Sequence, residues 1–309
     1  MIVARASRRA SIARPPALLT TIAVLMLAAG LILFYVIGSP GGPPQPSGTD
    51  RAVAPMTNDT GPSTKGPSKI EETAAKLVPP AAVFAAIASR DASALRTALA
   101  AKPDLSQAAT DGAMKGLAPL AAATRTGDAA LVGAILAAGA SVDQTGAEER
   151  TALHEAAAIG SAAAVEAILK ANAAVDARDA AGRTALMLAV AGGHEAAVAA
   201  LLAGGVSVNV ADDKGVTAVA LAADGSASIS LLDRLIQAKG DPAAADKAGQ
   251  TPLMRAAARG NADKVIALLN AGALASTKAA DGKTARDLAL ARGDDAGRAC
   301  AAVLEQAVP

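Results

Sequence analysis

The strongest constraint on the fold of this chain is a short residue pattern that recurs at an almost constant interval. Successive openings of the pattern lie 33, 33, 33, 34 and 33 residues apart. A fixed period of this length indicates a solenoid, in which each repeat is one supersecondary unit that buries its apolar face against its neighbours. The openings are Ala118-Pro119-Leu120, Thr151-Ala152-Leu153, Thr184-Ala185-Leu186, Thr217-Ala218-Val219, Thr251-Pro252-Leu253 and Thr284-Ala285-Arg286.

Each opening has the signals of a helix start. A Thr at the first position can cap a helix with its hydroxyl oxygen, and Pro119 and Pro252 occupy the next position, where a missing N–H costs nothing. The Leu that follows and the Ala three places after it predict an apolar stripe on this first helix. A glycine nine residues after the opening predicts a left-handed residue, at which the helix ends and the chain reverses. These glycines are Gly127, Gly160, Gly193, Gly260 and Gly293.

A second helix is predicted after each of these glycines. Aliphatic residues four apart would place an apolar stripe on one face of the helix, and a Gly or Asn that tolerates the left-handed conformation follows it. The stripe residues are Val132 and Leu136, Val165 and Leu169, Val198 and Leu202, and Val265 and Leu269. The residues predicted to end the helix are Gly139, Asn172, Gly205 and Gly272.

The remaining residues of each unit are predicted to form a turn. A glycine two residues before the next Thr marks the tight bend of most of these turns. The turns cover residues 143–150, 176–183, 209–216, 243–250 and 276–283, and the glycines are Gly182, Gly215, Gly249 and Gly282.

The period and the opening together resemble the ankyrin repeat, whose opening motif is T-P-L-H-x-A. The resemblance implies an all-α fold, an ankyrin-repeat solenoid of helix-turn-helix units with projecting β-turn fingers. Upstream, Val83, Ile87, Leu95 and Leu99 resemble the apolar stripes, so residues 81–117 are interpreted as an N-terminal capping repeat with a longer, irregular finger, and six repeats follow at 118–309. The bounds predicted for the six are 118–150, 151–183, 184–216, 217–250, 251–283 and 284–309.

Two units depart from the pattern. In the fourth unit Gly225 comes one residue early, and Ser226 to Leu231 lengthen the turn before Leu232, so this turn is the expected place of local mobility or of a specialised contact. The sixth unit has Asp287 where the second has His154. We expect this last unit to be a cap with a polar outer face, which solubility requires of a terminal repeat.

Residues 17–37 have no charged side chain over 21 positions, and as a helix they would span roughly 31 Å, which matches a bilayer core. Four arginines precede this segment, so the positive-inside rule predicts a cytoplasmic N-terminus (1–16) and an uncleaved signal anchor that forms a single transmembrane helix. The alternatives are a cleaved signal peptide, for which the apolar run is too long, and a merely buried helix.

Residues 38–80 are predicted to be a linker, because they are rich in Pro, Gly, Ser and Thr and contain few large apolar groups. One short helix is expected within it. Ser68 and Glu71 have the spacing of a capping box, Glu72 and Lys76 are four apart, and Pro79 would end the helix.

Composition excludes several functional classes. The net charge is +1, so no overall field attracts nucleic acid. A single cysteine, Cys300, excludes an internal disulfide and a cysteine metal cluster, and it is expected to be a small packing residue. The two histidines lie forty residues apart and do not have the spacing of a two-His metal site, and nothing in the sequence points to Ser-His catalysis. The resemblance to ankyrin repeats implies a structural hydrogen-bonding role for His154. We therefore predict no enzyme activity, no cofactor and no metal.

The resemblance implies a protein partner. In ankyrin proteins the fingers and the exposed face of the first helices line a concave groove in which partners bind. By position, the first helices of this chain would contribute Arg125, Glu155, Ile159, Leu188, Arg255, Arg259 and Arg292. The fingers would contribute Gln144, Thr145, Arg178, Asp179, Val210, Asp212, Lys247 and Lys278.

These observations predict a membrane-tethered ankyrin-repeat scaffold that mediates protein–protein interaction. The Ala-rich composition and the anchor favour a single-pass protein of a bacterial inner membrane, with the repeat domain periplasmic or extracellular and monomeric. The alternative is a structural or stress-related subunit of an envelope complex that associates through the membrane helix.

Overall fold

The computed structural model of the chain describes residues 80–110 and 112–307. All the described residues belong to one compact unit of the chain. In the described part of the chain, no helix is both long enough and apolar enough to cross a bilayer.

Three predictions concern residues outside the described part. They are the basic N-terminus (1–16), the transmembrane segment (17–37) and all but the last residue of the linker (38–80), which includes the short helix expected from Ser68.

The described residues form helices in pairs, without β-strands. The first helices of the pairs are α3 (Ala81–Ser89), α5 (Pro119–Arg125), α7 (Ala152–Ala158), α9 (Ala185–Ala191), α11 (Ala218–Asp224), α13 (Pro252–Arg259) and α15 (Ala285–Leu290). The second helices are α4 (Ala92–Ala100), α6 (Ala129–Ala137), α8 (Ala162–Lys170), α10 (Glu195–Ala203), α12 (Ile229–Gln237), α14 (Ala262–Asn270) and α16 (Asp295–Gln306). Two short 3-10 helices, η1 (Gly112–Met114) and η2 (Ala147–Glu149), lie in the first two turns.

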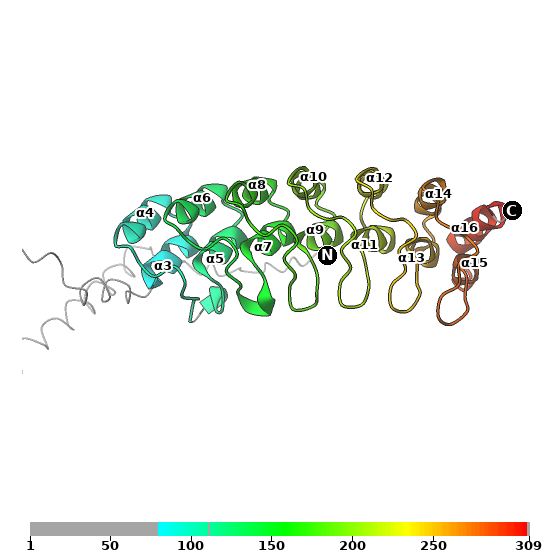
Figure 1. The fold of residues 1–309 in the computed structure, drawn as a ribbon, viewed down its shortest axis with the longest axis horizontal. Coiled ribbons are helices and arrows are strands. Elements are labelled where there is room, and N and C mark those ends of the chain that lie inside the picture. The colour runs from blue at the N-terminus through cyan, green and yellow to red at the C-terminus, as the bar shows by residue number, and fades with distance from the viewer. Residues whose placement is uncertain (1–79, 111, 308–309) are drawn as a thin grey trace, which may run out of the picture. The chain divides into compact units, whose positions relative to one another are not determined.

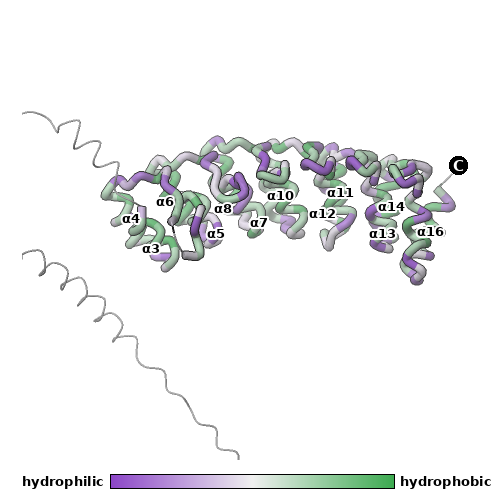
Figure 2. The backbone as a smooth tube through the Cα atoms, turned by 90° about the horizontal axis from the view of Figure 1, so that it is seen from below, coloured by the Kyte–Doolittle hydropathy of each residue, from purple (hydrophilic) through white to green (hydrophobic). Residues whose placement is uncertain are grey.

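The pairs stack side by side in chain order and form two layers. First helices pack against first helices and second helices against second helices, and the turns project beyond the first-helix layer as fingers (Figure 1). Hydrophobic segments run along the helices of every pair (Figure 2), and one apolar core extends from Val83 to Leu304. The prediction of an all-helical solenoid with projecting turns is confirmed for the described residues.

The predicted helix caps are present. The Thr hydroxyl before α9, α11, α13 and α15 accepts a hydrogen bond from the backbone N–H three residues later, at 3.3 to 3.5 Å. At the first opening Ala118 cannot make this bond, and Pro119 stands at the first helical position, where it needs none.

The predicted chain reversals are left-handed, as expected. The five glycines nine residues after an opening have φ between 68° and 76°. Arg90 has φ 55° at the same place after α3, although it carries a side chain. Asp91 then caps α4, accepting hydrogen bonds from the N–H groups of Ser93 and Ala94 at 2.8 and 3.0 Å.

The fourth unit makes its reversal differently. Gly225 has φ −86° and ψ −172°, an extended conformation, and Ser228 caps α12 one residue later than the other units begin their second helix. The extra residue explains the single 34-residue step. After α12 it is Lys239, with φ 65°, that takes the left-handed position.

The predicted apolar stripe of the second helices needs a correction. The fully buried pairs are three residues apart, namely Val132 and Ile135, Val165 and Ile168, Val198 and Leu201, and Val265 and Leu268. The predicted partners four residues on, Leu136, Leu169, Leu202 and Leu269, are only partly buried at the edge of the core. The face that meets the first helices is therefore rotated by about one residue from the predicted one.

Backbone hydrogen bonds connect neighbouring fingers, which the sequence pattern did not indicate. The Ala180 N–H donates to the Glu148 carbonyl at 2.9 Å, and the Lys247 N–H donates to the Lys214 carbonyl at 2.9 Å. Equivalent bonds join Asp213 to Ala181 at 3.2 Å and Ala280 to Ala248 at 3.0 Å. The fingers are thus linked in a row along one edge of the stack.

Candidate functional site

The candidate site is the surface formed by the exposed side chains of the first helices and by the fingers, and we call it the finger surface. All the residues predicted to bind a partner lie on these elements. Their exposure differs widely, because some of them point into the contacts between repeats.

Asp179 anchors the finger before α9. Its carboxylate is buried and accepts hydrogen bonds from the backbone N–H groups of Ala181 and Arg183 at 3.0 and 2.9 Å. The Arg183 guanidinium adds a hydrogen bond at 2.9 Å and an ion pair at 2.7 Å. Burial by itself would raise the pKa of Asp179, but the hydrogen bonds from Arg183 and Ala181 hold that pKa below its usual 3.8.

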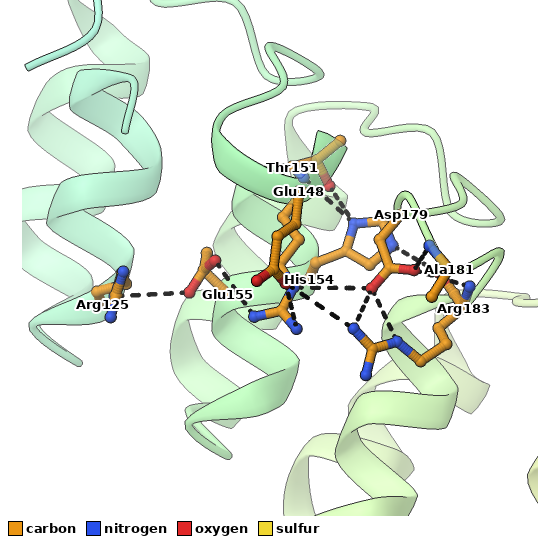
Figure 3. A network of polar contacts seen from close by, with 9 residues as sticks. Arg125, Glu148, Thr151, His154, Glu155, Asp179, Ala181 and Arg183 are labelled. Atoms are coloured by element: carbon orange, nitrogen blue, oxygen red, sulfur yellow. Dashed lines mark hydrogen bonds and ion pairs between the residues drawn. The ribbon is translucent and has the colours of Figure 1, made fainter. Parts of the chain in front are cut away.

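Figure 3 shows Glu155 of α7 on the same side of the stack as Asp179 and Arg183 of the next finger. Arg150 connects this finger to the preceding repeat. Its guanidinium lies 3.1 Å from Glu148, 4.0 Å from Glu155 and 3.7 Å from Asp179. Glu155 also pairs with Arg125 at 3.7 Å, so the ion pairs run from α5 to the finger before α9. The Arg150 Nε is buried and makes no hydrogen bond within the described part of the chain.

His154 is a second link between repeats. Its Nδ1 lies 3.3 Å from the N–H of Thr151 and 2.9 Å from the hydroxyl of Thr151, and its Nε2 lies 3.0 Å from the carbonyl of Arg183. The neutral imidazole satisfies all three contacts when Nδ1 accepts and Nε2–H donates. Burial lowers the pKa of His154 below its ordinary 6.5. The side chain is completely buried, so it is a structural group.

A cluster of charges lies on α11, α13 and the finger between them. Arg255 pairs with Asp224 at 3.2 Å and with Asp246 at 2.5 Å, and Arg259 pairs with Asp224 at 2.6 Å. Burial alone would raise the pKa of Asp246, but hydrogen bonds from the Gln250 N–H and from Arg255 lower it below 3.8. The Arg255 side chain is 16% exposed and that of Arg259 is 64% exposed, so Arg259 is the cation of this cluster that solvent reaches.

Lys264 on α14 is a buried cation that the sequence analysis missed. Its Nζ donates to the carbonyls of Ala222 at 2.7 Å and of Gly225 at 2.8 Å, at the C-terminal end of α11. Burial lowers the pKa of Lys264, and the negative charge of Asp224 opposes that shift. Lys264 therefore holds the irregular turn of the fourth unit. A specialised contact was expected at this turn, and this contact within the molecule is one.

Several predicted residues are exposed on the finger surface. Ile159 is 38% exposed at the end of α7, and 52% of the Arg125 side chain is exposed at the end of α5. Arg178 lies on a finger and pairs with Asp213 of the next finger at 3.0 Å. Lys247 and Lys278 are exposed at their fingers.

Other predicted residues are not available to a partner in this structure. Asp179, Glu155 and Leu188 are buried, with exposures of 4%, 6% and 9%. They lie between neighbouring repeats, where two of them join the ion pairs of Arg150, and this contact removes them from the surface.

Three more predicted residues have internal contacts. The Asp212 carboxylate accepts hydrogen bonds from the N–H groups of Lys214 and Val216, both at 2.8 Å. The Gln144 amide donates to the Ser106 carbonyl, and Val210 is partly buried against the core. Each of these side chains therefore helps to shape its finger.

Periodicity could have identified most of the structural residues that were missed. Arg150 and Arg183 both stand one residue before an opening Thr, 33 residues apart. Lys264 occupies a place at which four other units have a buried Leu or Ala, namely Leu131, Ala164, Ala197 and Leu231, so a polar residue there signals a specific partner.

The described residues include no cluster of three or more His, Cys, Asp or Glu side chains that could hold a metal ion. Cys300 is completely buried in α16, and burial raises the pKa of its thiol. A thiol in that setting is weakly nucleophilic.

Family models agree with the arrangement of the helices. A model of ankyrin repeats in three copies matches residues 120–212 and 156–232, and a model of many-copy ankyrin repeats matches residues 235–289. Together these segments make up more than half of the chain.

Solved structures contain the same fold. The crystal structure of the ankyrin repeat domain of Bcl-3, described as a unique member of the IkappaB protein family, matches with a TM-score of 0.60 and 24% sequence identity. The match covers 67% of this chain and 92% of that chain, and at this identity it shows the fold alone. No curated protein sequence matches significantly. Because 488 solved chains match, the fold does not select a particular partner.

Proposed function

Because the chain belongs to the ankyrin-repeat family, whose members serve as protein-binding scaffolds, we propose that it binds a protein partner through its finger surface. Within that surface we assign the contact to the exposed residues Arg125, Ile159, Arg178, Lys247, Arg259 and Lys278. Glu155, Asp179, Leu188, Val210, Asp212, Gln144 and Arg255 support it from within the stack.

One observation supports this assignment more than any other. Ile159 and Arg259 lie at corresponding places near the ends of α7 and α13, and both are exposed, although Arg259 also pairs with Asp224. A half-exposed aliphatic side chain and a solvent-accessible guanidinium are groups that contribute strongly to protein interfaces. Their separation by three repeats is consistent with an extended contact along the row of fingers.

The proposal is tested with a photo-reactive amino acid placed at Ile159 or Arg259 in the full chain inside intact cells. We expect both positions to cross-link to the same protein. Ile266 on α14 is the matched control, because it is 42% exposed but lies on the opposite layer. A partner captured equally well from Ile266 would contradict binding through the finger surface.

Substitution gives a second test. We expect Ile159→Asp and Arg259→Glu to reduce recovery of that partner about tenfold each, since an anchor residue typically contributes more than about 1 kcal/mol. Ile266→Asp and Arg234→Glu introduce the same chemistry on the second helices and should leave recovery unchanged. Equal losses in both pairs of variants would indicate a general effect on folding.

We further propose that residues 17–37 anchor the chain in a bacterial inner membrane, with the repeats on the periplasmic side. The support is the uncharged segment and the arginines that precede it. Protease added to spheroplasts should digest the repeats together with a known periplasmic protein. Repeats that survive while that protein is digested would contradict this orientation.

The alternative is a structural or stress-related envelope subunit that associates through its membrane segment. This alternative differs from binding through the finger surface in one measurable respect. If it holds, residues 1–80 alone should retain the partner. If the partner is retained by residues 1–80 and is insensitive to Arg259→Glu, the membrane segment is the interface.

A further inference from the structure

The N-terminal end of the stack has an apolar face that no described residue covers. It is a hollow of about 620 Å³ between α3 and α4, lined by Pro80, Ala82, Ala85, Ala94, Thr97, Ala98 and their neighbours. No charged side chain belongs to this lining, and α3 is coloured hydrophobic along most of its length (Figure 2). We call this surface the α3–α4 end face.

The other end of the stack is polar by contrast. The last helix, α16, exposes 95% of the Asp295 side chain, 63% of Arg298 and 69% of Glu305. A terminal repeat needs such a face because no further repeat covers it. The α3–α4 end face lacks these charges, so it has the character of an internal contact between repeats.

The segment that enters α3 has the pattern of an amphipathic helix. In residues 68–78, Ile70, Ala74, Leu77 and Val78 recur at the spacing i, i+4, i+7 and i+8. The charged residues Glu71, Glu72 and Lys76 fall between them and Lys69 precedes them, and Ser68 with Glu71 forms a capping-box pattern.

We propose that residues 68–78 form a helix that packs its apolar side on the α3–α4 end face and caps the solenoid. Eleven residues give a helix of roughly 16 Å, enough to cover the nine-residue α3. Only Pro79 separates this segment from Pro80, which itself lines the hollow, so the occupant is already tethered beside its site.

The cap does not depend on the partner proposed above, and its tests use different residues.

Hydrogen exchange of the full chain in detergent tests the cap. In the double variant Ile70→Asp and Leu77→Asp, we expect the amides of α3 and α4 to exchange at least about tenfold faster, because the apolar contact that covers them is lost. The control double variant Lys69→Asp and Lys76→Asp places the same residues on the polar side and should exchange like the unmodified chain. Equal exchange of α3 and α4 in all three chains would overturn the proposal.

Cross-linking identifies the occupant directly. A photo-reactive amino acid at Leu77 should cross-link to α3 or α4 of the same chain. Mixing chains with normal and heavy isotope labels separates this product from a contact between copies. Cross-links found only between differently labelled chains would show that a second copy covers the face, and cross-links to neither helix would show that residues 68–78 do not; both results contradict the cap.

Discussion

Buried polar side chains connect neighbouring repeats in the N-terminal half of the stack. Asp179 holds its own finger and faces Arg150 of the preceding unit, and His154 reaches the backbone carbonyl of Arg183 in the next. Asp179 and His154 are satisfied by internal hydrogen bonds, as a buried polar group must be to avoid a large desolvation penalty, whereas Nε of Arg150 is buried without a hydrogen bond from the described residues. These contacts set the register between neighbouring units. The apolar, Ala-rich core by itself defines that register only weakly.

His154 should make the stability of the repeats depend on pH. Its pKa is lowered in the folded chain, so its contribution is fully present above the ordinary value of 6.5. Below 6.5 the unfolded chain takes up a proton that the folded chain does not, and stability falls by up to about 1.4 kcal/mol per pH unit. The loss ends once the pH is below the folded pKa.

Urea unfolding between pH 7.5 and 5 measures this effect. We expect His154→Gln to unfold at lower urea than the unmodified chain at pH 7.5, but to lose less stability on acidification. His194→Gln is the control, because His194 is only partly buried and makes one bond to the carbonyl of Ala158 at 3.0 Å. An unchanged pH dependence in His154→Gln would show that another group is responsible.

At the scale of the element, the turn between α11 and α12 is held by a side chain from the next unit. Gly225 leaves α11 in an extended conformation, so the last carbonyls of the helix lack the usual backbone partners of a left-handed reversal. Lys264 supplies hydrogen bonds to two carbonyls in this region instead. The irregular turn and the buried lysine therefore depend on each other.

Removing the Lys264 side chain should destabilise the turn between α11 and α12. We expect Lys264→Ala to lower the free energy of unfolding by about 2 kcal/mol, because the buried carbonyl of Ala222 and the partly buried contact to Gly225 lose their partner and a cavity is left. Hydrogen exchange should rise most in residues 218–231. Lys170→Ala removes an exposed lysine from α8 and should have little effect on either measurement. A comparable loss from Lys170→Ala would indicate that helix propensity or charge, and not the contact, is being measured.

The reversals between first and second helices should differ in their tolerance of a side chain. Gly160 and Gly193 have similar φ values of 74° and 68°, so a change to Ala adds about 1 kcal/mol of backbone strain at both. A Cβ at Gly160 would also lie 2.5 Å from Nδ1 of His194, whereas Gly193 has no atom within 4 Å of that position.

We therefore expect Gly160→Ala to destabilise the chain clearly more than Gly193→Ala, as measured by urea unfolding. The clash must displace His194 and with it the hydrogen bond to Ala158. Equal losses would mean that His194 moves away without cost.

At the scale of the whole stack, the contact between the third and fourth units is looser than its neighbours. The second helices α10 and α12 pack less closely than any other adjacent pair of second helices, and α9 packs less closely on α11 than α11 does on α13. The extra residue before α12 accounts for this, because it displaces α12 from the repeat. In a solenoid the stability is a sum of units and contacts, so the loosest contact is where the stack divides most easily.

Because of this loose contact, we expect residues 217–307 to unfold locally without the repeats before them. Leu235→Ala in α12 should raise hydrogen exchange throughout residues 217–307. Residues 118–183 should stay protected, because the loose contact between the third and fourth units does not carry the loss of stability to them. The matching variant Leu153→Ala in α7 should raise hydrogen exchange in residues 118–183 and leave residues 217–307 protected. Uniform loss of protection in both variants would show that the stack unfolds as one unit.

The recurring sequence by itself determined the local structure of this protein. The 33-residue period, the capping Thr residues and the reversing glycines were sufficient to predict paired helices and their turns, because each signal acts within a few residues of its own position. The structural role of His154, which the resemblance to ankyrin repeats implied, is also confirmed.

Only the tertiary structure decided which side chains remain exposed. Glu155 stands at a variable place in the repeat and yet is buried, and Lys264 takes a core position because two carbonyls from another unit meet it there. The buried stripe of the second helices likewise turned out to be Ile135 and its equivalents, not Leu136. These outcomes depend on groups brought together from different repeats, and a pattern read along one chain does not contain the angle at which neighbouring units stack.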